Sequence, residues 1–199
     1  MKNSPVLSIL VLSFILIAAT WSADPTQMTI TPESRMWVDG TSTVHDWTCD
    51  VGEVDGNVTL DAETGAVSKA AVTVASSSIE CDSRTMNRKV AEALAIDDFP
   101  VIRYTLSTAD VMSSGEELRI DAVGTLELAG ASKEMSSSLV GQPASEGGYV
   151  FTGTLPITMS TFDIDPPTAM FGALKTGDDV TVRFEIYAVP GSGRLSSGQ

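Results

Sequence analysis

His45 and Asp46 form the one neighbouring pair in this 199-residue sequence that could begin acid–base or nucleophilic chemistry, because His45 is the single histidine. A Ser-His-Asp triad would need a serine that the fold brings to His45, yet the sequence has no Gly-x-Ser-x-Gly nucleophile elbow. We expect His45 and Asp46 to bond backbone groups at the start of a strand. A hydrolase that uses His45 stays open as an alternative.

Paired acidic residues are the second candidate for chemistry. The pairs are Asp97 with Asp98, Glu116 with Glu117, Asp163 with Asp165, and Asp178 with Asp179. Glycoside hydrolysis needs two carboxylates about 5–10 Å apart in a cleft, whereas these acids lie at predicted turns, where they are solvated. Zinc needs three or four Cys, His or carboxylate ligands, and the calcium-loop spacing is missing. We therefore predict no catalytic residues, no metal site and no cofactor, which argues against an enzyme.

Cys49 and Cys81 are the only thiols. A redox pair lacks the Cys-x-x-Cys motif, and a metal site lacks further ligands. In an exported protein two cysteines most often form one disulfide. We predict a structural Cys49–Cys81 disulfide, which would stabilise the fold by about 3–4 kcal/mol in the chain-entropy model.

The first residues have the pattern of a secretory signal peptide. Lys2 precedes an apolar run from Val6 to Ala19, and small residues follow. That run is too short for a membrane span of about 20 residues. We expect residues 1–22 to be the signal peptide and the protein to be periplasmic or secreted. The formal charge of −14 argues against nucleic acid or anionic lipid surfaces as partners, since both bind clustered Lys and Arg.

The remaining residues alternate between apolar and polar side chains. From Leu118 to Leu128 the apolar side chains share one parity, and the chain turns at Ala129-Gly130-Ala131 into a second such run. This pattern predicts a hairpin with one buried, apolar face and one exposed face. The other expected strands are Met28–Thr31, Arg35–Val38, Asp46–Val51, Val54–Asp61, Val67–Ser76, Val101–Val111, Lys133–Val140, Tyr149–Met159 and Asp179–Val189.

One segment has helical periodicity instead. In Ser83–Ala95 the apolar Met86, Val90 and Leu94 recur every four residues, and Pro100 ends any helix by Phe99. The prediction is an all-β domain over residues 23–190, with this one short helix and a disordered tail at residues 191–199. Such a sheet buries its apolar face by closing into a barrel of about eight strands or by packing as a sandwich, and periodicity does not separate these two.

Four blocks of sequence resemble the YceI-like family of exported bacterial proteins, which have a lipocalin-like antiparallel barrel and bind polyisoprenoid lipids. The blocks are Gly40–Trp47, Met86–Leu106, Gly124–Lys133 and Met159–Phe184. Two departures from the commonest family pattern are the cysteine pair and Arg84-Thr85 at the start of the helix. The resemblance implies a lipocalin-like barrel that carries or sequesters an apolar lipid of the isoprenoid or quinone type.

Aromatic and apolar residues spread over several strands would line this pocket, although ordinary core packing also explains them. The expected lining residues are Trp47, Met86, Val90, Leu94, Phe99, Ile102, Tyr104, Leu126, Phe151 and Phe184. The helix would cover the barrel opening as a lid or plug its end. Gly124, Ala122 and Gly153 on inward stripes would leave room for a ligand, whereas a structural β-domain without a ligand would have a filled core. The sequence is also compatible with a homodimer.

Overall fold

The computed structural model describes residues 25–61, 64–169 and 174–191. They form an antiparallel barrel with one α-helix, α1, over Arg84–Leu94. The strands are β1 (Thr26–Ile30), β2 (Arg35–Ser42), β3 (Trp47–Val51), β4 (Val54–Leu60), β5 (Val67–Ala75), β6 (Ile79–Cys81), β7 (Val101–Ser114), β8 (Glu117–Leu128), β9 (Ala131–Pro143), β10 (Tyr149–Thr158), β11 (Thr168–Ala169) and β12 (Leu174–Pro190). Three 3₁₀ turns complete the set: η1 (Ser76–Ser78), η2 (Ser145–Gly147) and η3 (Met159–Phe162).

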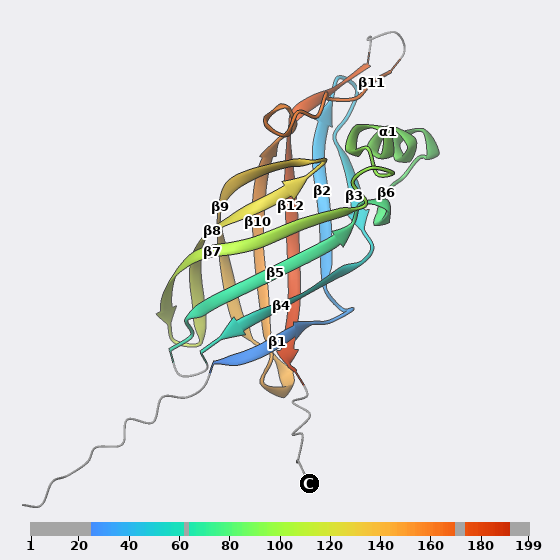
Figure 1. Cartoon of the computed structure of the whole chain (residues 1–199). Coiled ribbons are helices and arrows are strands. Elements are labelled where there is room, and N and C mark those ends of the chain that lie inside the picture. The colour runs from blue at the N-terminus through green and yellow to red at the C-terminus, as the bar shows by residue number, and fades with distance from the viewer. Residues whose placement is uncertain (1–24, 62–63, 170–173, 192–199) are drawn as a thin grey trace, which may run out of the picture.

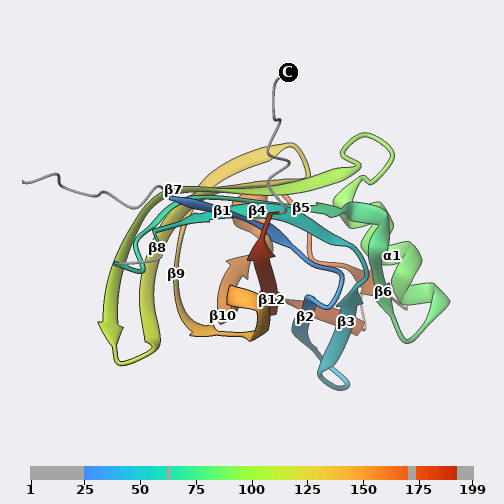
Figure 2. The same ribbon diagram turned by 90° about the horizontal axis from the view of Figure 1, so that it is seen from below.

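Eight strands make the closed wall of the barrel. Their order is β1-β4-β5-β7-β8-β9-β10-β12, and β1 pairs with β12 to close the circuit. At this closure Met28 lies opposite Pro190 and Ile30 lies opposite Ala188. The first and last described strands therefore meet at one end of the barrel, which we call the terminal end. Figure 2, viewed from below, shows the strands running round this circuit.

The wall divides toward the other end, because β12 has a second partner along the same edge. Beyond the β1 pairing, β12 pairs with β2, from Glu185 opposite Arg35 to Thr176 opposite Ser42. Strand β3 adds to β2, and the short β6 adds to β3. The helix α1 follows β6 directly and lies beside it, at the end that also carries β11 (Figure 1). We call this the helix end.

The expected β8–β9 hairpin is confirmed. Along β8 the buried residues alternate with exposed or half-buried ones from Leu118 to Leu128, since successive side chains point to opposite faces. The turn residues Ala129 and Gly130 both have positive φ, at 48° and 81°. Positive φ at both central residues is typical of a type I′ turn, whose twist matches the flanking strands.

The predicted helix is also confirmed, with Ser83 as its N-cap. The Ser83 hydroxyl oxygen accepts a hydrogen bond from the Met86 N–H, at 3.2 Å. This contact satisfies one of the free N–H groups in the first turn. Ala95 ends the helix in the left-handed conformation, and its N–H donates to carbonyl oxygens of the last turn. No residue of α1 is fully buried, so the helix lies on the barrel and is not part of its core.

Two apolar clusters hold the barrel together. The larger cluster lies toward the terminal end and includes Met28, Leu60, Leu118 and Phe151, each at most 5% exposed. The smaller cluster lies toward the helix end, where Phe162 of η3 and Ile164, two residues after it, pack on β8, β10 and β12. The predicted signal peptide and all but the first residue of the predicted tail lie outside the described residues.

A cavity that opens beneath the helix

The barrel encloses a cavity of about 490 Å³. Its volume is within the range of about 300–1,000 Å³ that small-molecule sites occupy. The wall consists mainly of Val, Ile, Leu, Met and Ala side chains from every strand of the closed circuit and from β2 and β3. No aspartate or glutamate is among the described lining residues. Such a space favours binding of an apolar chain, because a polar ligand would lose its hydrogen bonds to water on entering it.

The cavity runs along the barrel from the terminal end to the helix end. Its deeper part is lined by residues such as Val58, Ile120 and Phe151, which belong to the larger apolar cluster. At the helix end it meets the side of α1 that carries Met86, Val90 and Leu94. The four-residue spacing of these side chains puts them on one face of a helix, so this face of α1 closes over the apolar space.

The polar lining residues gather at the helix end. They are Ser42 and His45 near the end of β2, Ser83, Thr85 and Lys89 at α1, and Thr168, Lys175 and Thr176 on β11 and β12. The rest of the described lining contributes only Tyr104 and Ser137 as polar side chains. The cavity is therefore amphipathic along its length, with an apolar interior and one polar opening.

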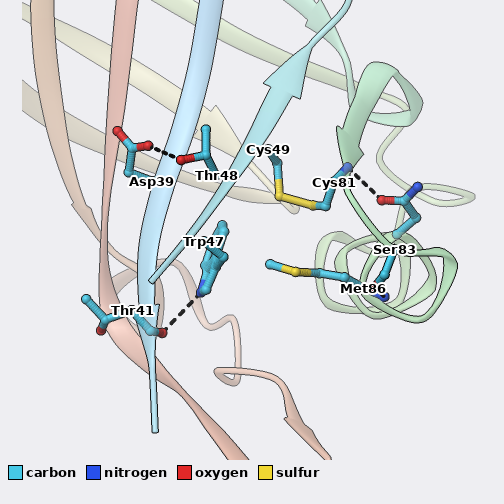
Figure 3. The surroundings of a disulfide bond; sticks show 9 residues. Asp39, Thr41, Trp47, Thr48, Cys49, Cys81, Ser83 and Met86 are labelled. Carbon is cyan, nitrogen blue, oxygen red and sulfur yellow. Dashed lines mark hydrogen bonds between the residues drawn. A yellow bond between two sulfur atoms is a disulfide. The ribbon is translucent and has the colours of Figure 1, made fainter. Parts of the chain in front are cut away.

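A disulfide holds α1 next to this opening. Cys49 on β3 and Cys81 on β6 are cross-strand partners and are bonded, as the sequence predicted. The Cys81 N–H donates to Oδ1 of Asn87, at 2.7 Å, which joins β6 to the first turns of α1. Figure 3 shows the Met86 side chain pointing from the helix toward Trp47, whose indole N–H donates to the Thr41 carbonyl. The bond thus fixes both sides of the opening to each other.

Tyr104 places a buried polar atom in the wall. Its hydroxyl is buried and makes no hydrogen bond of normal geometry. Burial raises the pKa of the phenol, and the nearby Ser137 hydroxyl lowers it by less. A neutral phenol is therefore the form that lines the cavity at physiological pH.

The two inward glycines do not provide the free space, contrary to the sequence-based expectation for them. A Cβ at Gly124 would lie 2.4 Å from the Tyr104 ring, and a Cβ at Gly153 would lie 2.7 Å from the Phe184 ring. Aromatic rings fill both places. Of the three small residues, Ala122 alone lines the cavity.

Most of the predicted lining residues border the cavity. The structure places Trp47, Met86, Val90, Leu94, Ile102, Tyr104, Leu126, Phe151 and Phe184 in its wall. Phe99 is not among them: it is 40% exposed, and its ring lies against Gly130 of the β8–β9 turn. The Phe-Pro step leads out of the helix toward β7, and this path turns the ring away from the interior.

His45 and the acidic pair Asp178 and Asp179 contact nearby backbone and hydroxyl groups. The His45 Nδ1 lies 2.7 Å from the Asp46 carbonyl oxygen, and both residues are exposed. Asp178 accepts from the N–H and hydroxyl of Ser160, and Asp179 accepts from the Thr158 hydroxyl. These acids fix the η3 turn to the start of β12.

Sequence reasoning missed the lining residues Lys89, Lys175 and Thr176. Lys89 lies between Met86 and Val90 on a predicted amphipathic helix. A single lysine on such a helix did not indicate that its side chain borders the cavity. Lys175 and Thr176 precede the part of β12 whose alternation was visible. In the described residues no helix is long and apolar enough to cross a membrane.

Comparison with known proteins gives one family. The model of the YceI-like domain matches residues 21–188. No curated protein sequence matches the chain. Two similar solved structures are BcnA of Burkholderia cenocepacia, with a TM-score of 0.66 and 17% identity over 79% of this chain and 97% of that one, and a polyisoprenoid binding domain from Saccharophagus degradans, with a TM-score of 0.65 and 15% identity over 84% and 99%.

A third similar structure is a Campylobacter jejuni YceI protein, with a TM-score of 0.56 and 17% identity over 70% of this chain and 82% of that one. At these identities the likeness is one of fold.

Proposed function

Because the chain belongs to the YceI-like domain family, we propose that it is an exported, non-enzymatic binding protein that encloses the long apolar chain of a lipid of the isoprenoid or quinone type. The observation that carries this proposal is the cavity of about 490 Å³ with its apolar interior. The Saccharophagus degradans domain of the same fold is described as polyisoprenoid binding.

Burial of the lipid tail would supply the affinity. Each methylene group removed from water contributes about 0.8 kcal/mol, from which the costs of ordering the chain and the protein are subtracted. A long tail in an apolar wall therefore binds well without any strong polar contact. This mechanism makes no use of nucleophiles, metals or cofactors.

The residues proposed to contact the tail are taken from the expected lining residues that border the cavity. Trp47 and the helix residues Met86 and Val90 would contact it near the opening, and Ile102 and Phe151 would contact it deeper in. Met86 is suited to the opening because its flexible thioether side chain adapts to different chain shapes. The helix α1 would act as a cover that must move when the lipid enters.

Export is supported by the leader pattern of residues 1–22 and by the Cys49–Cys81 disulfide. Disulfides persist in oxidising compartments and are rare in the cytosol. N-terminal sequencing of the protein recovered from the periplasm or medium tests this part, with a mature end at Ala23 expected. Recovery of an unprocessed chain in the cytosol would contradict it.

The direct test of lipid binding is mass spectrometry of an organic extract from the purified protein. We expect a co-purifying lipid with a long apolar chain, and we expect added prenyl lipids to raise the melting temperature through preferential binding to the folded state. If no lipid co-purifies and added prenyl lipids neither bind nor raise the melting temperature, the proposal fails. A ligand-free structural module would then be the better description.

A further inference from the structure

The charges in the cavity wall have the opposite sign to those of the whole protein. The chain has 26 acidic residues against 12 lysines and arginines. The described lining of the cavity nevertheless contains Lys89 and Lys175 and no carboxylate. The described opening of the cavity is therefore cationic on a protein whose overall charge is strongly acidic.

Lys89 comes from the cavity-facing side of α1. It is half-buried and lies between Met86 and Val90, which line the same space. Its neighbour Arg88 faces away from the cavity, is 67% exposed and pairs with Glu92 at 3.5 Å. Adjacent positions on a helix point in different directions, so the two cations have different surroundings.

Lys175 comes from the start of β12, beside the β2–β3 loop. Its N–H donates to the Thr43 hydroxyl oxygen, and its carbonyl accepts from the Thr43 N–H. These two bonds fix the position of Lys175 at the helix end. The hydroxyl-bearing Thr85 and Thr176 line the same end of the cavity.

Both ammonium groups are free of ion pairs within the described residues. The four ion pairs found there all use arginine, namely Arg88, Arg103, Arg119 and Arg183. Neither Lys89 nor Lys175 has a described carboxylate within 4 Å. Two cations without a described ion-pair partner, at the end where most of the described polar lining lies, leave a position for a negative charge on the ligand.

We propose that Lys89 and Lys175 bind the anionic head group, a carboxylate or a phosphate, of the lipid whose chain occupies the cavity. This inference rests on the proposed function and narrows it, because it favours an acidic amphiphile over a neutral alcohol or quinone. The head group stays at the polar helix end, where water and the threonine hydroxyls complete its hydrogen bonds. Charge-assisted hydrogen bonds are the stronger class, so the head group adds affinity as well as orientation.

The test compares ligands that differ only in the head group. Calorimetric titration at low ionic strength with farnesol and farnesyl phosphate, and with dodecanol and dodecanoate, measures each Kd. We expect the anionic member of at least one pair to bind about tenfold more tightly than its alcohol, since a few favourable charge contacts have this effect. The phosphate and carboxylate arms identify which anion is preferred.

Two double variants separate the site from the overall charge. Lys89→Met with Lys175→Met keeps the apolar stems and should remove the preference for the anion, while the Kd of the alcohol changes by less than about twofold. Arg88→Met with Lys69→Met removes the same charge from positions outside the cavity and should leave both values unchanged. Melting curves confirm that each variant is folded.

The outcomes distinguish the two proposals. If the alcohols bind and the anions bind no more tightly, or if the Lys89→Met and Lys175→Met variant keeps the preference, the head-group proposal is wrong and the lipid-binding proposal stands. If none of the four ligands binds and no lipid co-purifies, both proposals are wrong.

Discussion

The phenol ring of Tyr104 on β7 occupies the space that a side chain at Gly124 on β8 would need. A Cβ at position 124 would lie 2.4 Å from the Tyr104 Cζ and 2.6 Å from the Thr105 carbonyl oxygen. The first of these contacts involves a ring in the cavity wall, and the second involves backbone that cannot move without disturbing the β7–β8 pairing. Glycine at this position is thus required by packing.

Replacing Gly124 with alanine should therefore destabilise the protein. We expect the free energy of unfolding to fall by about 1–3 kcal/mol, the usual cost of forcing extra atoms into a packed core. Chemical denaturation measures this change. Gly191→Ala is the matched control, because its Cβ would meet only ordinary contacts at 3.5 Å or more. Equal stability of the two variants would contradict the close approach of Tyr104.

Filling the cavity should reduce lipid binding and leave the fold intact. Ala122 lines the cavity and pairs with Ala109, which also lines it. Ala122→Leu places a larger apolar side chain in this space, so the amount of co-purified lipid per protein should fall by at least about half, with little loss of stability. Thr105→Leu, which is exposed on β7, should retain the lipid. Full lipid content in Ala122→Leu would show that the ligand does not occupy this space.

Removing the disulfide should lower stability. We expect Cys49→Ala with Cys81→Ala to reduce the free energy of unfolding by about 3–4 kcal/mol, because the unfolded chain regains the entropy of the open loop. Denaturation in urea measures the loss, and the native protein in excess dithiol should match the variant. A reduced protein as stable as the oxidised one would show that the bond contributes nothing to the fold.

Loss of the N-cap should loosen α1 without unfolding the barrel. Ser83→Ala removes the acceptor for the Met86 N–H, which costs about 1 kcal/mol of helix stability. Because no residue of α1 is fully buried, we expect faster hydrogen exchange in the helix and faster lipid release, with exchange in β8 unchanged. Ser77→Ala, at an exposed position in η1, is the control. Unchanged release would mean that α1 does not cover the entry path.

The Asp39–Arg183 contact should give a small stabilisation that depends on pH. The Arg183 guanidinium and, to a lesser extent, the Thr48 hydroxyl lower the pKa of the Asp39 carboxyl. The contribution is present above the unfolded pKa of about 3.9 and is lost as the pH falls through the lower folded pKa.

Because the pair is partly exposed, Asp39→Asn should cost less than about 1 kcal/mol at pH 7, and this difference should vanish at strongly acidic pH. Melting temperatures measured across this pH range test the prediction. Asp50→Asn on the neighbouring strand is the control, and a difference between native protein and Asp39→Asn that grows toward acid would contradict it.

The fold was predictable where one face of a strand or helix is buried and apolar. The alternation in Leu118–Leu128 and the four-residue spacing of Met86, Val90 and Leu94 gave the correct strand and helix, because burial of one face fixes the period. Strand β6 is three residues long and too short to show any period. The barrel closure was beyond periodicity, since it depends on which distant strands meet.

The apolar lining of the cavity was largely predictable, but its shape was not. Apolar inward residues from many strands indicated an apolar pocket, and most of them do line the cavity. The sequence could not reveal that Tyr104 and Phe184 fill the spaces above Gly124 and Gly153, because this depends on side-chain directions across neighbouring strands. It also could not reveal that Phe99 turns outward or that Lys89 faces the opening.

The pairing of Met28 with Pro190 has a consequence for how the protein folds. The two residues are nearly as far apart in sequence as the described domain allows, so the barrel closes only after its last strand has been synthesised. Such long-range contacts form slowly, because the entropy of closing a long loop must be overcome first. The enclosed space therefore comes into being with the final strand, and a newly made chain has no site for its ligand until the whole domain is complete.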